Sequence, residues 1–165
     1  MNGHNVYLSI GSNLGVRKYN ISKALSFLLA DNKIKILKKS RIYETEPVGP
    51  IAQPKFLNQV VFLSTLFSPF QLLGVLKSIE QKLGRNMNGI KWGPRQIDLD
   101  ILFYDFLILK TPRLIIPHPL ISERFFVLKP LAEISPRMLH PVLKKTARQM
   151  FLEIRGQEIR GQVST

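Results

Sequence analysis

The sequence has no cysteine, no long apolar run and no secretory pattern at its start, and each absence excludes a class of protein. Without cysteine, disulfides, zinc–thiolate sites and thiol catalysis are excluded. No apolar run approaches the roughly 18 residues of a membrane-spanning helix, so we expect no membrane partner. Residues 1–5 lack the basic and apolar stretches of a signal peptide. We therefore expect a cytoplasmic protein.

Acidic residues are also scarce: 11 Asp and Glu stand against 24 Lys and Arg, which gives a net charge of +13. Such a charge attracts anions, and nucleic acid, an acidic membrane surface or a phosphorylated small molecule would all fit. A basic solvated surface without a specific ligand fits as well. The charge alone therefore names no partner.

The length of 165 residues and the 45% hydrophobic content predict a single globular domain over residues 1–165. Strand-like segments occur at Val6–Ile10, Lys33–Thr45, Leu57–Leu66 and Gln96–Tyr104. Helical spacing predicts two buried stripes, first Ile21, Leu25, Leu28 and Leu29, then Leu72, Leu76, Ile79 and Leu83.

The resulting βαββαβ order predicts a ferredoxin-like α/β (α+β) fold, with helices packed on an antiparallel sheet. Ser68 followed by Pro69 is typical of a helix start, and Gly84 of a helix end. A hairpin near Asp105 and a C-terminal helical extension from Phe126 to about Arg155 would follow, with the last ten or so residues frayed.

The last strand of this unit carries two acids within an apolar segment. Strand side chains alternate between faces, so Ile97, Leu99, Ile101 and Phe103 would form core and Asp98 and Asp100 would share the opposite face. Their backbones would lie about 6.6–6.8 Å apart, close enough for both carboxylates to bind one ion or flank two. Oxygen ligands without cysteine favour Mg²⁺ over zinc. The alternative is an exposed face that pairs with Lys or Arg.

Cationic residues surround the two aspartates in the sequence. Arg85, Lys91 and Arg95 lie in or beside the polar loop Arg85–Pro94 that precedes the strand. Arginine binds phosphate oxygens in a bidentate manner, and cations beside metal-binding acids are typical of phosphoryl-transfer sites. We therefore predict a nucleotide triphosphate site in which this loop closes over the ligand.

Two other segments have weaker signals. Gly11–Gly15 follows a strand and precedes a helix, but it lacks Gly-Lys-Ser/Thr and is therefore interpreted as a turn rather than a Walker A motif. His118 lies between Pro117 and Pro119. A capping role and a contact to nucleotide phosphate are both consistent with that position.

Several segments together resemble the 6-hydroxymethyl-7,8-dihydropterin pyrophosphokinases, a family of folate-biosynthesis enzymes. The similarity extends from about Tyr7 to Pro136. Its most specific segment is Trp92–Leu102, supported by Tyr7–Gly15, Thr45–Pro50, Gln53–Asn58, Pro117–Pro119 and Arg124–Phe126. The resemblance implies an enzyme that transfers the β,γ-pyrophosphate of ATP to the pterin hydroxymethyl group and releases AMP. It implies two Mg²⁺ ions and a monomer that binds pterin and ATP but no nucleic acid.

The resemblance also implies the roles of individual residues. Asp98 and Asp100 would hold the metal ions and, with Arg85 and Arg95, carry out catalysis. The implied nucleotide-binding residues are Glu80, Trp92, Ile101, Arg113, His118 and Arg124. The implied pterin-binding residues are Thr45, Val48, Phe56, Asn58 and Phe126. Phe56 and Phe126 would stack on the two faces of the ring and Asn58 would bind its edge; without the resemblance, both phenylalanines would be assigned to the core.

Three positions depart from the family pattern. Met87 stands where many relatives carry a second loop arginine, and Phe56 and Pro119 replace frequent tyrosines. These changes would affect rate and affinity rather than the type of reaction.

The main alternative is an RNA-binding module of the RRM type, which shares the βαββαβ order and a basic charge. Such a module stacks bases on an aromatic pattern in its third strand. Leu57–Leu63 lacks this pattern, and paired acids would repel the RNA backbone. The enzyme is therefore the favoured interpretation.

Overall fold

The computed structural model describes residues 2–84 and 93–163. Its central sheet contains β1 (His4–Ser12), β2 (Ile34–Lys39), β3 (Tyr43–Thr45), β4 (Phe56–Thr65) and β5 (Asp98–Tyr104). The strand order is β2-β4-β1-β5, with the short β3 paired to β4. All of these pairings are antiparallel. This is the predicted ferredoxin-like arrangement, with β3 as an addition to it.

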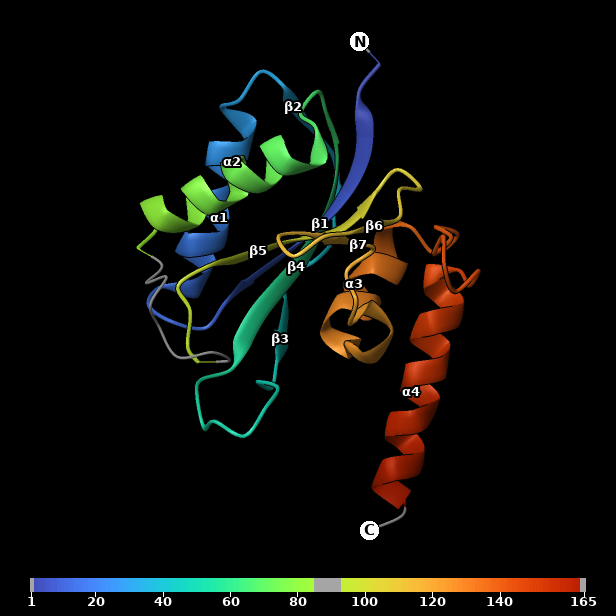
Figure 1. Ribbon diagram of the computed structural model, residues 1–165. Helices are drawn as coiled ribbons and strands as arrows, with labels where there is room; N and C mark the ends of the chain where they lie inside the picture. The colour runs from blue at the N-terminus through green and yellow to red at the C-terminus, as the bar shows by residue number, and fades with distance from the viewer. Residues whose placement is uncertain (1, 85–92, 164–165) are drawn as a thin grey trace.

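Helices cover both faces of the sheet (Figure 1). The first face carries α1 (Arg17–Leu29) and α2 (Pro69–Lys82), and the second carries α3 (Phe125–Ile134) and α4 (Ala147–Val163). Each face has its own apolar core, because strand residues alternate between the two. Val6, Leu8 and Ile10 pack on the α1–α2 side. Val60 and Leu102 pack on the α3–α4 side. No helix in the described residues has the length and apolarity needed to cross a membrane.

Helix α2 starts as its sequence predicts. The Ser68 hydroxyl accepts a hydrogen bond from the Gln71 backbone N–H at 3.3 Å, and the Gln71 side chain accepts one from the Ser68 N–H at 2.9 Å. Pro69 occupies the first turn, where no backbone donor is needed. At the other end, Gly84 adopts a φ of 88°, a value that favours glycine. These signals fix the position of α2 beside β5.

Phe103 lies on a different face from the predicted one. The β1–β5 register shifts between Tyr7, which pairs with Phe103, and Leu8, which pairs with Ile101. Leu102 is therefore an extra residue on β5, and the alternation reverses after it. Phe103 packs in the α3–α4 core, whereas Ile101 and Leu99 pack in the α1–α2 core as predicted.

Two helix predictions also need correction. Leu29 does not join the buried stripe of α1, since it is 61% exposed at the end of the helix. The C-terminal extension is not one helix but two, separated by residues 135–146, which include Pro136 and Pro141. Proline removes a backbone donor and clashes with a preceding turn, which explains the break.

The segment between β5 and α3 folds back across the sheet. The chain turns at Asp105 and Phe106, close to the predicted hairpin, and the hairpin itself forms from β6 (Leu109–Lys110) and β7 (Ile115–Ile116). A short 3₁₀ helix, η1 (Ile121–Glu123), leads into α3. This return path brings residues near position 118 beside β5.

Candidate active site

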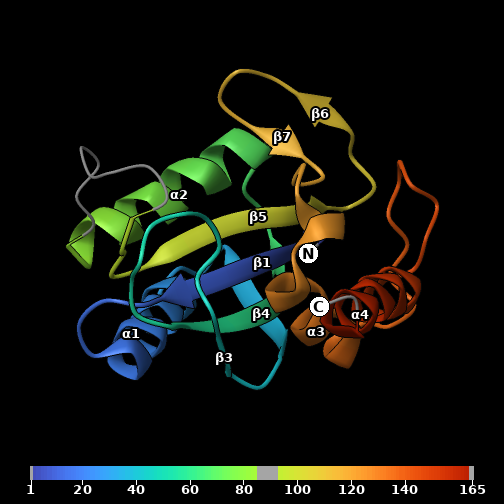
Figure 2. The same cartoon turned by 90° about the horizontal axis from the view of Figure 1, so that it is seen from below.

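A cavity of about 260 Å³ lies where β1, β4 and β5 meet α3 and the loop after β3. Figure 2 views the molecule from the side of β3, with β1, β4 and β5 side by side behind it. The strands contribute Ser9, Gly11, Thr45, Phe56, Asn58, Asp98 and Asp100 to its lining. Other segments contribute Glu46, Val48, Gln53, Lys77, Gly93, Arg95, His118, Arg124 and Phe126. The fold thus brings most of the predicted site residues into one cavity.

Asp98 and Asp100 share one face of β5, as strand alternation predicts. They lie opposite Gly11 and Ser9 of β1, whose small side chains leave space in front of the carboxylates. The intervening Leu99 points into the α1–α2 core. Two carboxylates therefore meet in a cavity rather than on an open sheet face.

The charge of this pair is only partly balanced. Burial, followed by the neighbouring Asp98 carboxylate, raises the pKa of Asp100 to about 7, although Arg124 and Lys77 act in the opposite direction. A guanidinium nitrogen of Arg95 lies 3.3 Å from Asp98 Oδ1. Carboxylates that are costly to ionise together are suited to a hard divalent cation, which would stabilise both charges. The chemistry of these donors fits Mg²⁺.

Glu80 supports β5 from the side of α2. Its side chain is completely buried, and its carboxylate accepts the backbone N–H of Leu99 at 2.9 Å. Its other oxygen lies 3.4 Å from Lys77 Nζ. Glu80 thus contacts the residue between the two aspartates. The sequence reasoning missed Lys77, although a lysine three residues before a buried glutamate is a recognisable pairing signal on a helix.

Asn13 is a second residue that the sequence reasoning did not single out. Its carboxamide oxygen accepts from the Arg95 backbone N–H at 2.8 Å, and its own N–H donates to the Arg95 carbonyl at 3.0 Å. Its side-chain nitrogen donates to Gln53 and to the Pro54 carbonyl, at 2.9 and 3.0 Å. The predicted turn at Gly11–Gly15 begins only after Ser12, since Gly11 and Ser12 belong to β1, and Asn13 within it is a brace between the residues just before β5 and the loop before β4.

His118 caps the turn that follows it and also faces the cavity. Its Nδ1 accepts the Leu120 backbone N–H at 3.2 Å, which is the capping contact, and the ring also lines the cavity. Burial, and then the Arg124 guanidinium, lower the pKa of His118 to about 4. The neutral ring that accepts at Nδ1 carries its proton on Nε2. That N–H is the donor that His118 can offer to an anion.

The aromatic end of the cavity is formed by β4, β3 and α3. Phe56 and Phe126 both line it, instead of lying wholly within the core. Asn58 is buried, and its side-chain nitrogen donates to Thr45 Oγ1 at 2.5 Å. A Cβ atom on Gly11 would lie 3.0 Å from Asn58 Oδ1, so glycine at this position keeps the amide in place. Val48 lines the same end and is 56% exposed.

Three predicted residues in the described part of the chain, Glu80, Ile101 and Arg113, do not line this cavity. Ile101 is buried in the α1–α2 core. Arg113 lies over the Phe70 ring of α2, 5.4 Å from its centroid. Arg85 and Trp92 lie outside the described residues, as do Lys91 and Met87.

Comparison with known proteins identifies relatives across most of the chain. Residues 7–136 match the family model described as 7,8-dihydro-6-hydroxymethylpterin-pyrophosphokinase (HPPK). The 2-amino-4-hydroxy-6-hydroxymethyldihydropteridine pyrophosphokinase of Bacillus subtilis is 44% identical over 132 residues, which are 80% of this chain and 78% of that protein. The enzyme of the same name from Aquifex aeolicus is 40% identical over 144 residues, 87% of this chain and 88% of its own.

Other relatives are longer proteins. A folate synthesis bifunctional protein of Arabidopsis thaliana is 46% identical over 129 residues, but these cover only 26% of it. Among solved structures, Plasmodium falciparum HPPK-DHPS wild type with pteroate matches 99% of this chain and 44% of its own, with a TM-score of 0.76 and 18% identity. That structural likeness supports the ferredoxin-like fold. The family model and the two enzymes lead to one conclusion: this chain belongs to the 7,8-dihydro-6-hydroxymethylpterin pyrophosphokinase family.

Proposed function

We propose that this pyrophosphokinase of folate synthesis transfers the β,γ-pyrophosphate of ATP to the hydroxymethyl group of 6-hydroxymethyl-7,8-dihydropterin and releases AMP. The observation that carries the proposal is a single cavity with two carboxylates at one end and two aromatic rings at the other. A polyanion and a flat heterocycle need these two environments side by side. The family membership of the chain agrees with both.

The aromatic end would hold the pterin. Phe56 and Phe126 offer ring faces for stacking, and such pairs stabilise a bound heterocycle beyond the area they bury. Asn58 is oriented by its hydrogen bond to Thr45, so its amide would recognise one edge of the ring. Backbone groups of Thr45 and Val48 would complete this part of the site.

The acidic end would hold Mg²⁺ and the phosphates. No cluster of three or more His, Cys, Asp or Glu occurs among the described residues, so Asp98 and Asp100 would share the ions with phosphate oxygens and water. Bound Mg²⁺ would neutralise charge on the phosphates. Around it, Arg95, Arg124 and the Nε2–H of His118 would contact phosphate oxygens, and Lys77 would add a further cation.

The protein would act mainly by positioning the reactants. The pterin hydroxyl oxygen would bond to the β-phosphorus and lose its proton to solvent, while the bond from that phosphorus to the α,β-bridging oxygen breaks, so that AMP leaves. When both substrates are held in one cavity, their reaction no longer requires a random encounter, because the reacting atoms are already oriented toward each other. Cationic side chains would reduce the repulsion between the hydroxyl and the polyanion.

The assay of products tests this proposal. The protein is incubated with ATP, the hydroxymethyl-dihydropterin and MgCl₂, and the nucleotides are separated by chromatography. We expect AMP and the pterin diphosphate in equal amounts, and no turnover after chelation of the metal by EDTA. ADP as the product would contradict pyrophosphoryl transfer, and turnover in EDTA would contradict the role of Mg²⁺.

The comparisons give no support to the RNA-binding alternative. In the structure, the sheet face that an RRM would offer to RNA is covered by α3 and α4 and carries the two aspartates.

A further inference from the structure

The two sides of the aromatic slot belong to different elements. Thr45 closes β3, and Phe126 lies in the first turn of α3. Strand β3 has only three residues and pairs only with β4 among the described strands. A strand this short gains little from its own hydrogen bonds, so its position relative to α3 depends on additional contacts.

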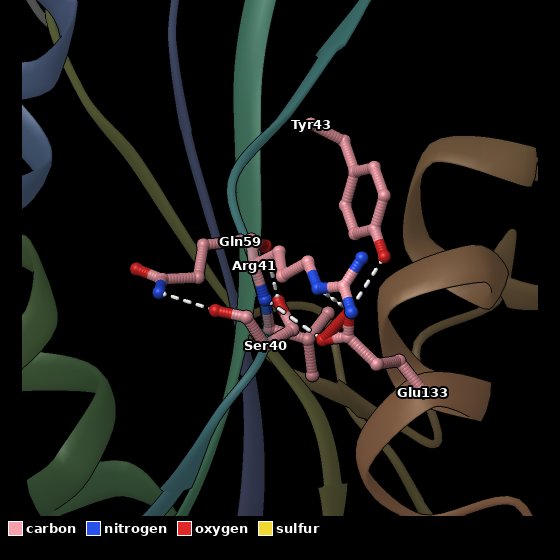
Figure 3. Close-up of polar contacts among 6 residues, drawn as sticks. Ser40, Arg41, Tyr43, Gln59 and Glu133 are labelled. Carbon is pink, nitrogen blue, oxygen red and sulfur yellow. Dashed lines mark hydrogen bonds and ion pairs between the residues drawn. The ribbon is translucent and has the colours of Figure 1, made fainter.

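A single carboxylate at the far end of α3 supplies those contacts. Glu133 accepts the Tyr43 hydroxyl at 2.5 Å through one oxygen and the Arg41 backbone N–H at 2.7 Å through the other. The Lys129 ammonium lies 4.7 Å from the centroid of the Tyr43 ring. We refer to Tyr43, Lys129 and Glu133 as the clasp. Figure 3 shows the Glu133 side chain pointing from α3 toward Tyr43 and Arg41.

The clasp and the slot are built on the same two elements, α3 and β3. Phe126, Lys129 and Glu133 are spaced by three and four residues, which places them on one stripe of α3. Tyr43 and Thr45 are two residues apart, which places them on one face of β3. Tyr43 pairs with Asn58 and Thr45 with Phe56 in the β3–β4 register. The same stripe and the same strand face therefore carry the slot at one end and the clasp at the other.

The chain just before β3 is anchored to the sheet. The Ser40 hydroxyl accepts from Val60 N at 3.0 Å, and Ser40 N donates to the Val60 carbonyl at 2.9 Å. The Gln59 side chain donates to the Ser40 carbonyl at 2.7 Å (Figure 3). Ser40 is thus fixed on β4, and the clasp controls the part of the chain between this anchor and Thr45.

We propose that Glu133, through Tyr43, is a positioning residue that holds β3 against α3 and so sets the width of the pterin slot between Thr45 and Phe126. This inference rests on the proposed function. When the walls of the slot are already held at the right width, pterin binding loses no free energy to ordering them, and the affinity for the pterin is higher. The two aspartates of the nucleotide end lie on β5, and no residue of the clasp lies on that strand.

Two substitutions test the proposal. Tyr43→Phe removes one hydroxyl, and Glu133→Gln removes the charge that accepts it. We expect each to raise the KM for the pterin about five- to tenfold, the effect of losing a charge-assisted hydrogen bond at a partly exposed site. The KM for ATP and kcat should stay within about twofold. Both variants lose the same hydrogen bond between Tyr43 and Glu133. The KM for the pterin of the double variant should therefore be no higher than that of the more impaired single variant.

The matched control is Glu153→Gln, since Glu153 also forms an ion pair, with Lys145 at 2.9 Å, but on α4. It should change neither KM. The proposal is overturned if Tyr43→Phe and Glu133→Gln leave pterin binding unchanged, if their effects add, or if both KM values rise equally with a lowered melting temperature. If the unmodified protein makes no AMP, the proposed function fails instead, which distinguishes the two failures.

Discussion

At the scale of single residues, Asp100 combines a functional position with an energetic cost. Its pKa is raised to about 7, so the folded protein retains a proton that the unfolded chain has lost between pH 3.8 and 7. The contribution of Asp100 to the free energy of unfolding therefore falls as the pH rises from 3.8 to 7. Above pH 7 the buried carboxylate is charged and destabilises the fold by its full amount. A site whose carboxylates are arranged for a cation lowers the stability of the fold in this way until the cation binds.

Replacing Asp100 by Asn should therefore stabilise the protein and inactivate it. In EDTA at pH 8, we expect Asp100→Asn to raise the free energy of unfolding by about 1–2 kcal/mol, or the melting temperature by roughly 3–6 °C. The difference should shrink toward zero near pH 4, where both proteins are uncharged at this position. Activity should fall by more than about 100-fold. The measurements are thermal melts from pH 4 to 8 and the AMP assay.

Asp31→Asn is the control, since Asp31 lies in the turn after α1 and accepts only a local hydrogen bond from Lys33 N at 2.9 Å. It should leave AMP production unchanged. A lowered melting temperature for Asp100→Asn at pH 8 would show that the Asp100 charge is already compensated without metal. Retained turnover would remove Asp100 from the catalytic site.

At the scale of elements, α2 is the support of the nucleotide end. It carries Lys77 and the buried Glu80, which accepts the Leu99 N–H of β5. Its N-terminal capping box and the glycine after it are both local signals, and both are visible in the sequence. The partner of Glu80 is not, because Leu99 is 19 residues away and is brought near only by packing.

Removing the cap of α2 should weaken the whole domain. We expect Ser68→Ala to lower the free energy of unfolding by about 1 kcal/mol, and the melting temperature by roughly 2–4 °C, because the Gln71 N–H loses its acceptor. Chemical denaturation by urea measures the change. Ser78→Ala in the exposed middle of the same helix is the control and should be neutral or slightly stabilising. Equal losses in both variants would refute a specific role of the cap.

At the scale of the whole molecule, the net charge of +13 should assist the capture of an anionic substrate. A field of this kind acts on the nucleotide and not on the uncharged pterin. Salt screens it, with a Debye length near 10 Å at 0.1 M and about 3 Å at 1 M.

Raising KCl from about 0.05 to 0.5 M should therefore weaken ATP binding several-fold and leave pterin binding nearly unchanged. Isothermal titration calorimetry with each substrate, at constant free Mg²⁺, gives the two salt dependences on one protein. The pterin is the internal control. Equal slopes would mean that salt acts on the protein fold and not through attraction of the nucleotide.

Local patterns in the sequence were sufficient for the βαββαβ order of the core, for the cap of α2 and for the shared face of Asp98 and Asp100. Each depends on spacing along the chain, and strand alternation or helical periodicity converts spacing into a face. The resemblance to the family located Phe56, Asn58 and Phe126, and without it both phenylalanines would have been assigned to the core. The comparisons confirmed the family.

Only the tertiary structure decided which residues meet across the chain. The bulge at Leu102 places Phe103 on the α3–α4 side, because one additional residue reverses the alternation that the sequence predicts. The brace at Asn13, the contact of Glu80 with Leu99 and the contact of Tyr43 with Glu133 join residues whose partners are set by sheet order and helix packing. Such long-range contacts leave no periodic trace in the sequence, so the aspartates and their shared face follow from the chain itself, whereas the depth, charge balance and width of the cavity around them follow from the fold.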